Sequence, residues 1–408
     1  MGADRIEGEM GSIDAYESAK GRRYRVRWRD PEHQQREKRG FRTKREAEQY
    51  AATVEVAMMR GTYFEPSQSR VTVGELAIDW LANKEQALKP SSFSPIRIAW
   101  RVYVEPRWAA TPIGAIRPSA VEKWIREVSL GKAVTVRVRP GNGGKPRSAG
   151  VVLRALGILA GILDVAVRDG RIPSNPARGA SNLPRKATKK RRRYLTNEEV
   201  FRFAGRAPDD MRSVLILTLA YTGIRWGEAV ALTVGDINLE RGRLSIHQTA
   251  TEVDGIIHVG PPKSWEARSV PFPAFLAPRL KALASGKKRS ALLFPARAGG
   301  YLARPSTAQN GQSWWLTALR DAELEHLTPH DLKHTAASLA VSAGANVKAL
   351  QRMLGHKSAA MTLDTYADLF EDDLGSVAER LNERVLSESG GELWIQRQVV
   401  QLDPQSSH

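Results

Sequence analysis

The chain has 408 residues, a formal net charge of +18 and no cysteine. Its length predicts two or three domains, each able to bury a core. The lack of cysteine excludes disulfides and thiolate metal sites. The excess of positive charge indicates a protein that binds a polyanion, against the alternative of a basic protein whose charge only keeps it soluble.

The first 21 residues lack the apolar core of a signal peptide. The longest apolar run, Val214–Tyr221, is too short to span a bilayer. We therefore expect an intracellular, soluble protein with no membrane partner.

Near the N-terminus, residues 20–48 contain twelve Lys or Arg and five Asp or Glu. The stretch Arg23–Arg29 alternates strictly, which predicts a strand with one apolar face and one arginine face. A second strand is expected over Lys38–Phe41, and a helix from Thr43 to near Gly61. We interpret this unit as a DNA-reading sheet, because sheets can enter the major groove. The alternative is a solvated edge strand. The predicted DNA contacts are Arg23, Arg25, Arg27 and Arg29.

From Val71 to Arg178 the pattern is helical, and a basic segment follows it. The expected helices are Val73–Leu88, Ser91–Val104, Ser119–Val128 and Ser148–Asp169. The segment Leu183–Arg193 carries seven Lys or Arg and no acid. Such a segment is typical of a linker that lies along a DNA phosphate backbone, and a nuclear-import signal stays open as an alternative. The predicted DNA contacts here are Lys189, Lys190, Arg191, Arg192 and Arg193.

After Tyr194 the pattern becomes mixed. Thr196 and Glu199 predict a capping box that opens a helix, and Ser213–Tyr221 predicts a buried helix. Short strands are expected over Asp236–Gln248, Ile256–Val259 and Ser269–Pro271, around a turn at Asp254-Gly255. Helices are expected over His330–Leu339, Val347–Leu354, Ala360–Leu369 and Asp373–Val385.

The candidate chemistry lies mainly in Thr328–Tyr366. This stretch places His330 and Lys333 one helical turn apart, His356 behind a Leu-Gly pair, and Tyr366 ten residues later. Cationic and imidazole groups around a phenol suit a phosphodiester, because its transition state carries extra negative charge and needs donors from several directions.

These motifs carry a specific resemblance to the tyrosine recombinases, also called the phage integrase family. Leu195–Leu381 resembles the family's catalytic domain, with motifs TGIRWGEAVAL, PPKSWEARSVPF, TPHDLKH and LGH followed by the tyrosine. The helical unit before it resembles the core-binding domain through KPSSFSPIR and VAVRDGRIPSNPA. The N-terminal sheet is similar to the arm-type DNA-binding domain of lambda-like and conjugative-transposon integrases.

The resemblance implies a role for each matched residue. Tyr366 is the nucleophile that forms a 3′-phosphotyrosyl bond, and Lys263 protonates the departing 5′ oxygen. The remaining positions are catalytic donors to the phosphate, with Glu228 as a supporting carboxylate: Arg225, His330, Lys333 and His356. The reaction implied uses no metal and no other cofactor.

One position departs from the family pattern. Lys333 stands where the family's His-x-x-Arg box has arginine. Lysine keeps the charge but loses the planar fork, so it makes a point contact and not a bidentate clamp. His334 lies about 100° further round the helix, so we expect it to be structural.

The expected fold class is therefore α+β and multidomain. It comprises a small N-terminal β-sheet plus helix, an all-α core-binding domain, and a mixed, mainly α catalytic domain of the tyrosine recombinase and type IB topoisomerase type. The expected boundaries are 1–66 for the arm-type domain, 67–181 for the core-binding domain, 182–194 for the basic linker, 195–386 for the catalytic domain and 387–408 for the tail.

The function implied is a site-specific integrase that joins mobile-element and host attachment sites through a Holliday junction. The alternatives are an enzyme that only relaxes supercoils, like a type IB topoisomerase, and a DNA-binding protein with impaired catalysis. The implied partners are double-stranded DNA with core-type and arm-type sites, three further copies in a homotetramer, and an accessory DNA-bending or excision factor. Asp373–Val385 and Leu393–Val400 are candidates for docking onto a neighbouring copy. The implied location is the cytoplasm of a bacterial host, at the nucleoid when DNA is bound.

Overall fold

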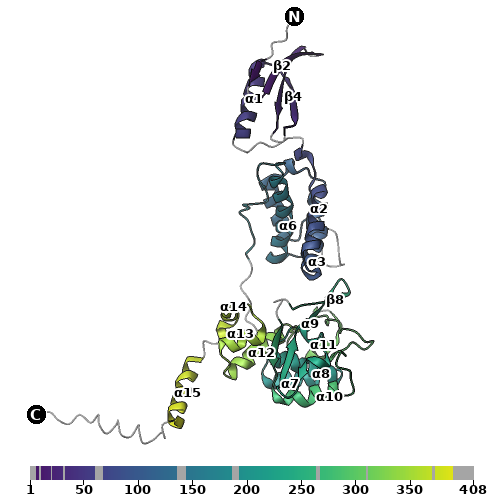
Figure 1. Cartoon of the computed structure of the whole chain (residues 1–408), viewed down its shortest axis with the longest axis vertical. Coiled ribbons are helices and arrows are strands. Elements are labelled where there is room, and N and C mark those ends of the chain that lie inside the picture. The colour runs from purple at the N-terminus through teal and green to yellow at the C-terminus, as the bar shows by residue number, and fades with distance from the viewer. Residues whose placement is uncertain are drawn as a thin grey trace, which may run out of the picture. The chain divides into compact units, whose positions relative to one another are not determined.

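The computed structural model describes residues 6–8, 11–19, 21–30, 33–59, 68–135, 144–185, 193–262, 267–308, 311–369 and 373–388. The chain divides into two compact units, Met1–Thr188 and Lys189–His408, which are described separately (Figure 1). Lys263, Lys189–Arg192 and the apolar island Leu393–Val400 lie outside the described residues.

The first unit begins with an antiparallel sheet in the order β1-β2-β3-β4. Its strands are β1 (Ile6–Gly8), β2 (Gly11–Ser18), β3 (Gly21–Arg29) and β4 (Gln35–Phe41). Helix α1 (Lys44–Met59) follows, and Val26 and Trp28 of β3 are buried in one cluster with its Ala47 and Val54. The predicted strand, its apolar face and the helix are thus confirmed. β2 was not predicted because GSIDAYES has weak strand propensity, and pairing with β3 decides its structure.

The other face of β3 carries the arginines, but neighbouring strands add acids to it. Asp14 of β2 pairs with Arg25, and Glu37 of β4 pairs with Arg27. The Asp14 carboxylate lies 3.4 Å from both guanidinium groups, and Glu37 lies 3.5 Å from that of Arg25. Part of the positive charge of this face is therefore compensated within the sheet.

The same unit continues with helices α2 (Val73–Ala87), α3 (Pro90–Ala99), α4 (Glu105–Trp108), α5 (Pro118–Ser129) and α6 (Ala149–Arg168). The predicted helix Ser91–Val104 is divided, because α3 passes through a π-helical turn at Trp100–Val104 into α4. Pro106 at the start of α4 has no N–H to donate to a regular helical hydrogen bond, which favours an irregular turn at this position.

Among the described residues, α6 is long and apolar enough by length and composition to cross a membrane. Half of its apolar window is buried inside the protein. The buried positions, including Leu159, Ile162 and Leu163, belong to the core of the helical unit, where Trp108 and Trp124 pack edge to face. A core helix of this kind has the same composition as a membrane span.

The second unit combines helices with two small sheets. Its first helices are α7 (Asn197–Gly205), α8 (Asp210–Thr222) and α9 (Trp226–Ala229). Its strands are β5 (Ile237–Asn238), β6 (Arg243–Ile246), β7 (Thr249–Val253), β8 (Ile256–Gly260) and β9 (Arg268–Pro271), paired as β5-β6-β9 and β7-β8. Its later helices are α10 (Ala277–Ala284), α11 (Trp314–Asp321), α12 (Asp331–Ser342), α13 (Val347–Leu354), α14 (Ala359–Tyr366) and α15 (Asp373–Glu388).

Two details of this unit bear on the predictions. The short strands expected over Asp236–Gln248 are β5 and β6, which a turn divides, and β7 starts just beyond them at Thr249. The turn at Asp254-Gly255 is confirmed: φ is 53° and 81°, the positive pair that a two-residue hairpin loop of type I′ requires.

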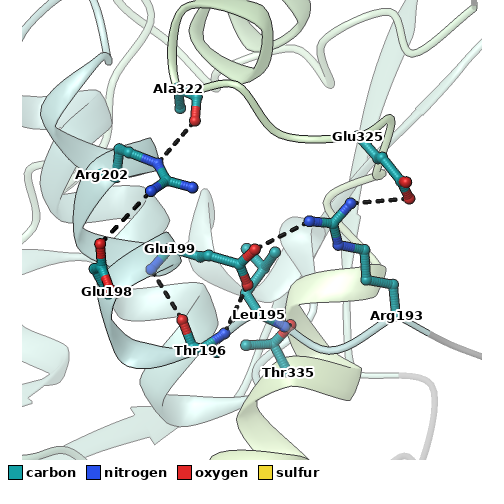
Figure 2. Close-up of polar contacts among 9 residues, drawn as sticks. All are labelled: Arg193, Leu195, Thr196, Glu198, Glu199, Arg202, Ala322, Glu325 and Thr335. Carbon is teal, nitrogen blue, oxygen red and sulfur yellow. Dashed lines mark hydrogen bonds and ion pairs between the residues drawn. The ribbon is translucent and has the colours of Figure 1, made fainter.

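The capping box at Thr196 is confirmed, and Arg193 reinforces it. The Thr196 hydroxyl accepts from Glu199 N at 3.2 Å, and the Glu199 carboxylate accepts from Thr196 N at 3.0 Å. Figure 2 shows the Arg193 guanidinium between Glu199 and Glu325, at 3.0 and 2.8 Å. Arg193 is therefore engaged in ion pairs inside the second unit, and its predicted contact with DNA stays a prediction.

Candidate active site

Arg225 is positioned by the way α8 ends. Gly223 adopts φ +64°, and a Cβ there would lie 2.6 Å from Leu354 on α13, so only glycine fits the close approach. The chain then turns into α9, where the Glu228 carboxylate accepts from Arg225 N at 2.8 Å and from its Nη1 at 3.0 Å. This capping arrangement fixes both the backbone and the guanidinium of Arg225.

A second arginine, Arg268 of β9, shares the same carboxylate. It donates from Nη1 and Nη2 to Glu228 at 3.0 and 2.7 Å, a bidentate pair. Glu228 is 1% exposed. Burial raises its pKa, but the hydrogen bonds and charge of Arg268 and Arg225 outweigh this and hold the pKa below its usual value. Two cations therefore flank one buried anion. The sequence reasoning missed Arg268, although it lies within the quoted PPKSWEARSVPF motif.

Gly355 connects this pair to the His356 segment. It ends α13 with φ +62°, and a Cβ there would lie 2.9 Å from Arg268 Nε. The backbone of the Leu-Gly-His sequence therefore packs closely against the Arg268 side chain at Gly355. Arg268 and His356 also line one open pocket, together with Ser269, Gln351, Arg352, Gly355 and Lys357.

His330 and Lys333 open α12, as predicted. The Asp331 carboxylate accepts from Thr328 N at 2.6 Å, which fixes the turn that presents His330. Lys333 is only 3% exposed, and its Nζ donates to Leu354 O at 2.7 Å. Although the His330 side chain reaches solvent, desolvation by its neighbours lowers its pKa, and the charges of Lys333 and Arg225 lower it further.

His356 and Tyr366 lie face to face. Their ring centroids are 6.1 Å apart with an interplanar angle of 6°, and His356 Nδ1 lies 3.0 Å from the Thr362 hydroxyl. Desolvation by burial, followed by the charges of Lys333 and Arg225, lowers the pKa of His356 to about 4. His356 is therefore neutral at physiological pH.

Tyr366 ends α14 and is fully buried. Its hydroxyl oxygen lies 2.8 Å from Nδ1 of His334, which the sequence reasoning had set aside as structural. The only sequence signal for this contact was the position of His334, directly after Lys333. The hydrogen bond joins residues 32 positions apart, on α12 and α14.

The second unit thus brings together most of the predicted catalytic residues. Arg225, Lys333 and His330 all act on the pKa of His356, so these groups share one electrostatic site. Lys263 falls between β8 and β9 along the chain, outside the described residues. The arginines of β3 belong to the other unit.

The buried carboxylate gives a testable prediction about stability. Replacing Glu228→Gln is expected to lower the free energy of unfolding by about 3 kcal/mol, because Arg225 and Arg268 then face each other without an anion. Urea unfolding measures this loss. The matched control is Glu198→Gln, whose carboxylate is 86% exposed in a pair with Arg202. The control should change stability by less than about 0.5 kcal/mol. Equal effects of the two substitutions would contradict a structural role for the buried pair.

The residues of this site fall within a segment that matches a known protein family. Residues 193–372 match the model of the phage integrase family. The chain resembles that family over this segment, which lies within the second unit. Among its relatives, the prophage integrase IntR of Escherichia coli K12 is 25% identical over 338 residues, which cover 77% of this chain and 80% of IntR.

Solved structures show the integrase fold at lower identity. The Tn1549 transposon integrase, in complex with a circular intermediate DNA, has a TM-score of 0.60 and 20% identity, covering 76% of this chain and 99% of that one. A lambda integrase tetramer bound to a Holliday junction has a TM-score of 0.50 and 17% identity, covering 85% of this chain and 96% of that one. The mixed helix-and-sheet fold predicted from the sequence is confirmed by these likenesses.

Proposed function

We propose that this chain is a site-specific DNA recombinase that cleaves and rejoins DNA through a 3′-phosphotyrosyl intermediate. The observation that carries the proposal is the placement of Tyr366 beside His334 and His356, because the charges of Arg225 and Lys333 act on His356 in the same site. A phenol supplies the nucleophile, and the surrounding cations stabilise the negative charge that develops on the phosphate.

The proposed steps follow from these groups. Tyr366 Oη attacks the scissile phosphorus, the P–O5′ bond breaks, and Lys263 gives a proton to the 5′ oxygen. Arg225 binds two non-bridging oxygens, since its guanidinium is held by Glu228 with a planar fork. Lys333 adds a point charge, and His330 and His356 complete the donor set. The 5′-hydroxyl of a partner duplex then attacks the phosphotyrosine and restores a phosphodiester.

We also assign DNA contacts to the rest of the chain. The arginine face of β3 reads arm-type sites, the helical unit 67–181 holds the core-type site, and the basic linker 182–194 follows the backbone between them. The ion pairs of Arg25 and Arg27 with Asp14 and Glu37 hold these guanidinium groups in place on the sheet. Four copies assemble on two duplexes, which the lambda tetramer supports. Helix α15, with Leu381 60% exposed, is the segment assigned to docking between copies.

A covalent-trapping experiment tests the proposal. The core site is first recovered by selecting bound duplexes from a random-sequence pool, and a nicked suicide duplex is built on it. The chain is expected to form an SDS-stable adduct, and mass spectrometry of the digested adduct is expected to place the nucleotide on Tyr366.

The alternatives give different results in the same experiment. Tight binding without any adduct would overturn the enzymatic function and leave a DNA-binding protein. Efficient relaxation of a supercoiled plasmid that lacks the selected site would favour a topoisomerase-like activity. An adduct on a residue other than Tyr366 would overturn the assignment of the nucleophile.

A further inference from the structure

The Tyr366 hydroxyl is in contact with the side chain of His334. Its Nδ1 lies 2.8 Å from the Tyr366 oxygen, inside the ordinary range for a hydrogen bond, and the two rings lie edge to face at 5.5 Å. Tyr366 is fully buried, and His334 is half-buried on α12, one residue beyond Lys333. The contact therefore fixes the reacting oxygen of the proposed nucleophile.

The other imidazoles of the site are placed differently. His356 stacks parallel to the Tyr366 ring, and its Nδ1 lies against Thr362, so it supports the ring and not the hydroxyl. His330 lies edge to face with His334, with ring centroids 5.0 Å apart. A row of three rings, His330, His334 and Tyr366, thus runs from the solvent-exposed edge of the site to the buried phenol.

We propose that His334 is a catalytic residue that accepts the proton of the Tyr366 hydroxyl as that oxygen attacks DNA. This rests on the proposed function of Tyr366 as the nucleophile. The O–H bond of Tyr366 breaks, its proton moves to Nδ1 of His334, and the Oη–P bond forms. The P–O5′ bond breaks at the same centre, and the departing oxygen takes its proton from Lys263.

The chemistry of the groups supports this step. A phenol has an ordinary pKa of about 10, so at neutral pH it needs a base in contact to become a strong nucleophile. A neutral imidazole is the side chain best suited to that task, and it must lie within hydrogen-bond reach of the proton that it takes. Acceptance at Nδ1 requires the tautomer of His334 with its proton on Nε2.

The test separates nucleophile activation from leaving-group protonation. Single-turnover adduct formation is measured on two suicide duplexes at the selected core site, one with an ordinary 5′ oxygen and one with a bridging 5′ sulfur. A thiolate departs without a proton, because thiols have a pKa of only about 8.5. The rate of adduct formation by Lys263→Ala should therefore recover on the duplex with the bridging sulfur. His334→Ala should form the adduct about 10²–10⁴-fold more slowly on both duplexes, because this variant lacks the base that takes the proton of the Tyr366 hydroxyl.

A second variant distinguishes proton transfer from simple positioning. In His334→Asn an amide replaces Nδ1 and can still hydrogen-bond to Tyr366, but it cannot take a proton at neutral pH. We expect the loss in His334→Asn to be as large as in His334→Ala. Full activity in His334→Asn would overturn proton acceptance and leave a positioning contact. The matched control is His326→Ala, an exposed histidine of the same unit whose Nε2 contacts Thr307 O; it should cleave at the wild-type rate.

The remaining outcomes are also decisive. Recovery of His334→Ala on the sulfur duplex would place its role at the leaving group and overturn the inference. Faster cleavage by His334→Ala would show that the contact restrains Tyr366, and it would overturn the inference as well. Absence of an adduct with the wild-type chain would refute the proposed function itself, a result distinct from a selective loss in the His334 variants.

Discussion

Replacing Tyr366 by phenylalanine is expected to abolish the covalent protein–DNA adduct while leaving the fold intact. Phenylalanine keeps the buried ring and its stacking on His356, so the packing of α14 should be unchanged. Only the hydroxyl is lost, together with its hydrogen bond to His334. One such bond contributes about 1 kcal/mol to stability, which is too little to unfold the domain. The measurement is adduct formation on the nicked core-site duplex, with urea unfolding of the same preparation.

The matched control for this substitution is Tyr221→Phe. Tyr221 lies in the same unit, and its hydroxyl donates to Asn197 at 2.7 Å, so the control also removes one tyrosine hydrogen bond. We expect adduct formation to be unchanged in Tyr221→Phe. An adduct that persists in Tyr366→Phe would assign the nucleophile to another residue, whatever the stability of that variant.

Replacing Lys333 by methionine is expected to slow cleavage by about 10²–10³-fold, as for the loss of one charged donor at a developing anion. Methionine has nearly the same length and suits the buried position, but it leaves Leu354 O without the ammonium donor. The local cost is about 1–3 kcal/mol. The rate is measured by single-turnover adduct formation.

A second measurement distinguishes the loss of charge from a local packing defect. The charge of Lys333 lowers the pKa of both His330 and His356, so in Lys333→Met both should titrate at higher pH. For His356 the shift begins from about 4 and should be visible in the ring signals of an NMR titration. Exposed Lys348→Met is the control and should change neither the rate nor the titrations. Unchanged cleavage in Lys333→Met would show that this position does not stabilise the transition state.

The Lys333 side chain also bears on the departure from the family pattern. Its ammonium group links the start of α12 to the last carbonyl of α13 through a hydrogen bond, so the lysine is integrated into the structure of this site. If Lys333→Arg cleaves no faster than the wild-type chain, lysine is sufficient at this position. A rise in rate would show that the planar fork of arginine makes a further contact with the phosphate.

Much of this protein is determined locally along the chain and could therefore be predicted from the sequence. Capping boxes, the Asp254-Gly255 turn and the alternation of Arg23–Arg29 act over a few residues, and the structure reproduces them. The spacing of the motifs around Arg225, His330, His356 and Tyr366 also indicated the phage integrase family, whose model matches residues 193–372.

Only the tertiary structure decided how the side chains meet. The contact of His334 with Tyr366, the shared carboxylate of Arg225 and Arg268, and the acids on the arginine sheet face all join separate elements. Helix geometry places His334 about 100° around α12 from Lys333. It does not predict which side of α12 packs against α14. Packing between helices sets that choice, and it places the proposed nucleophile against His334.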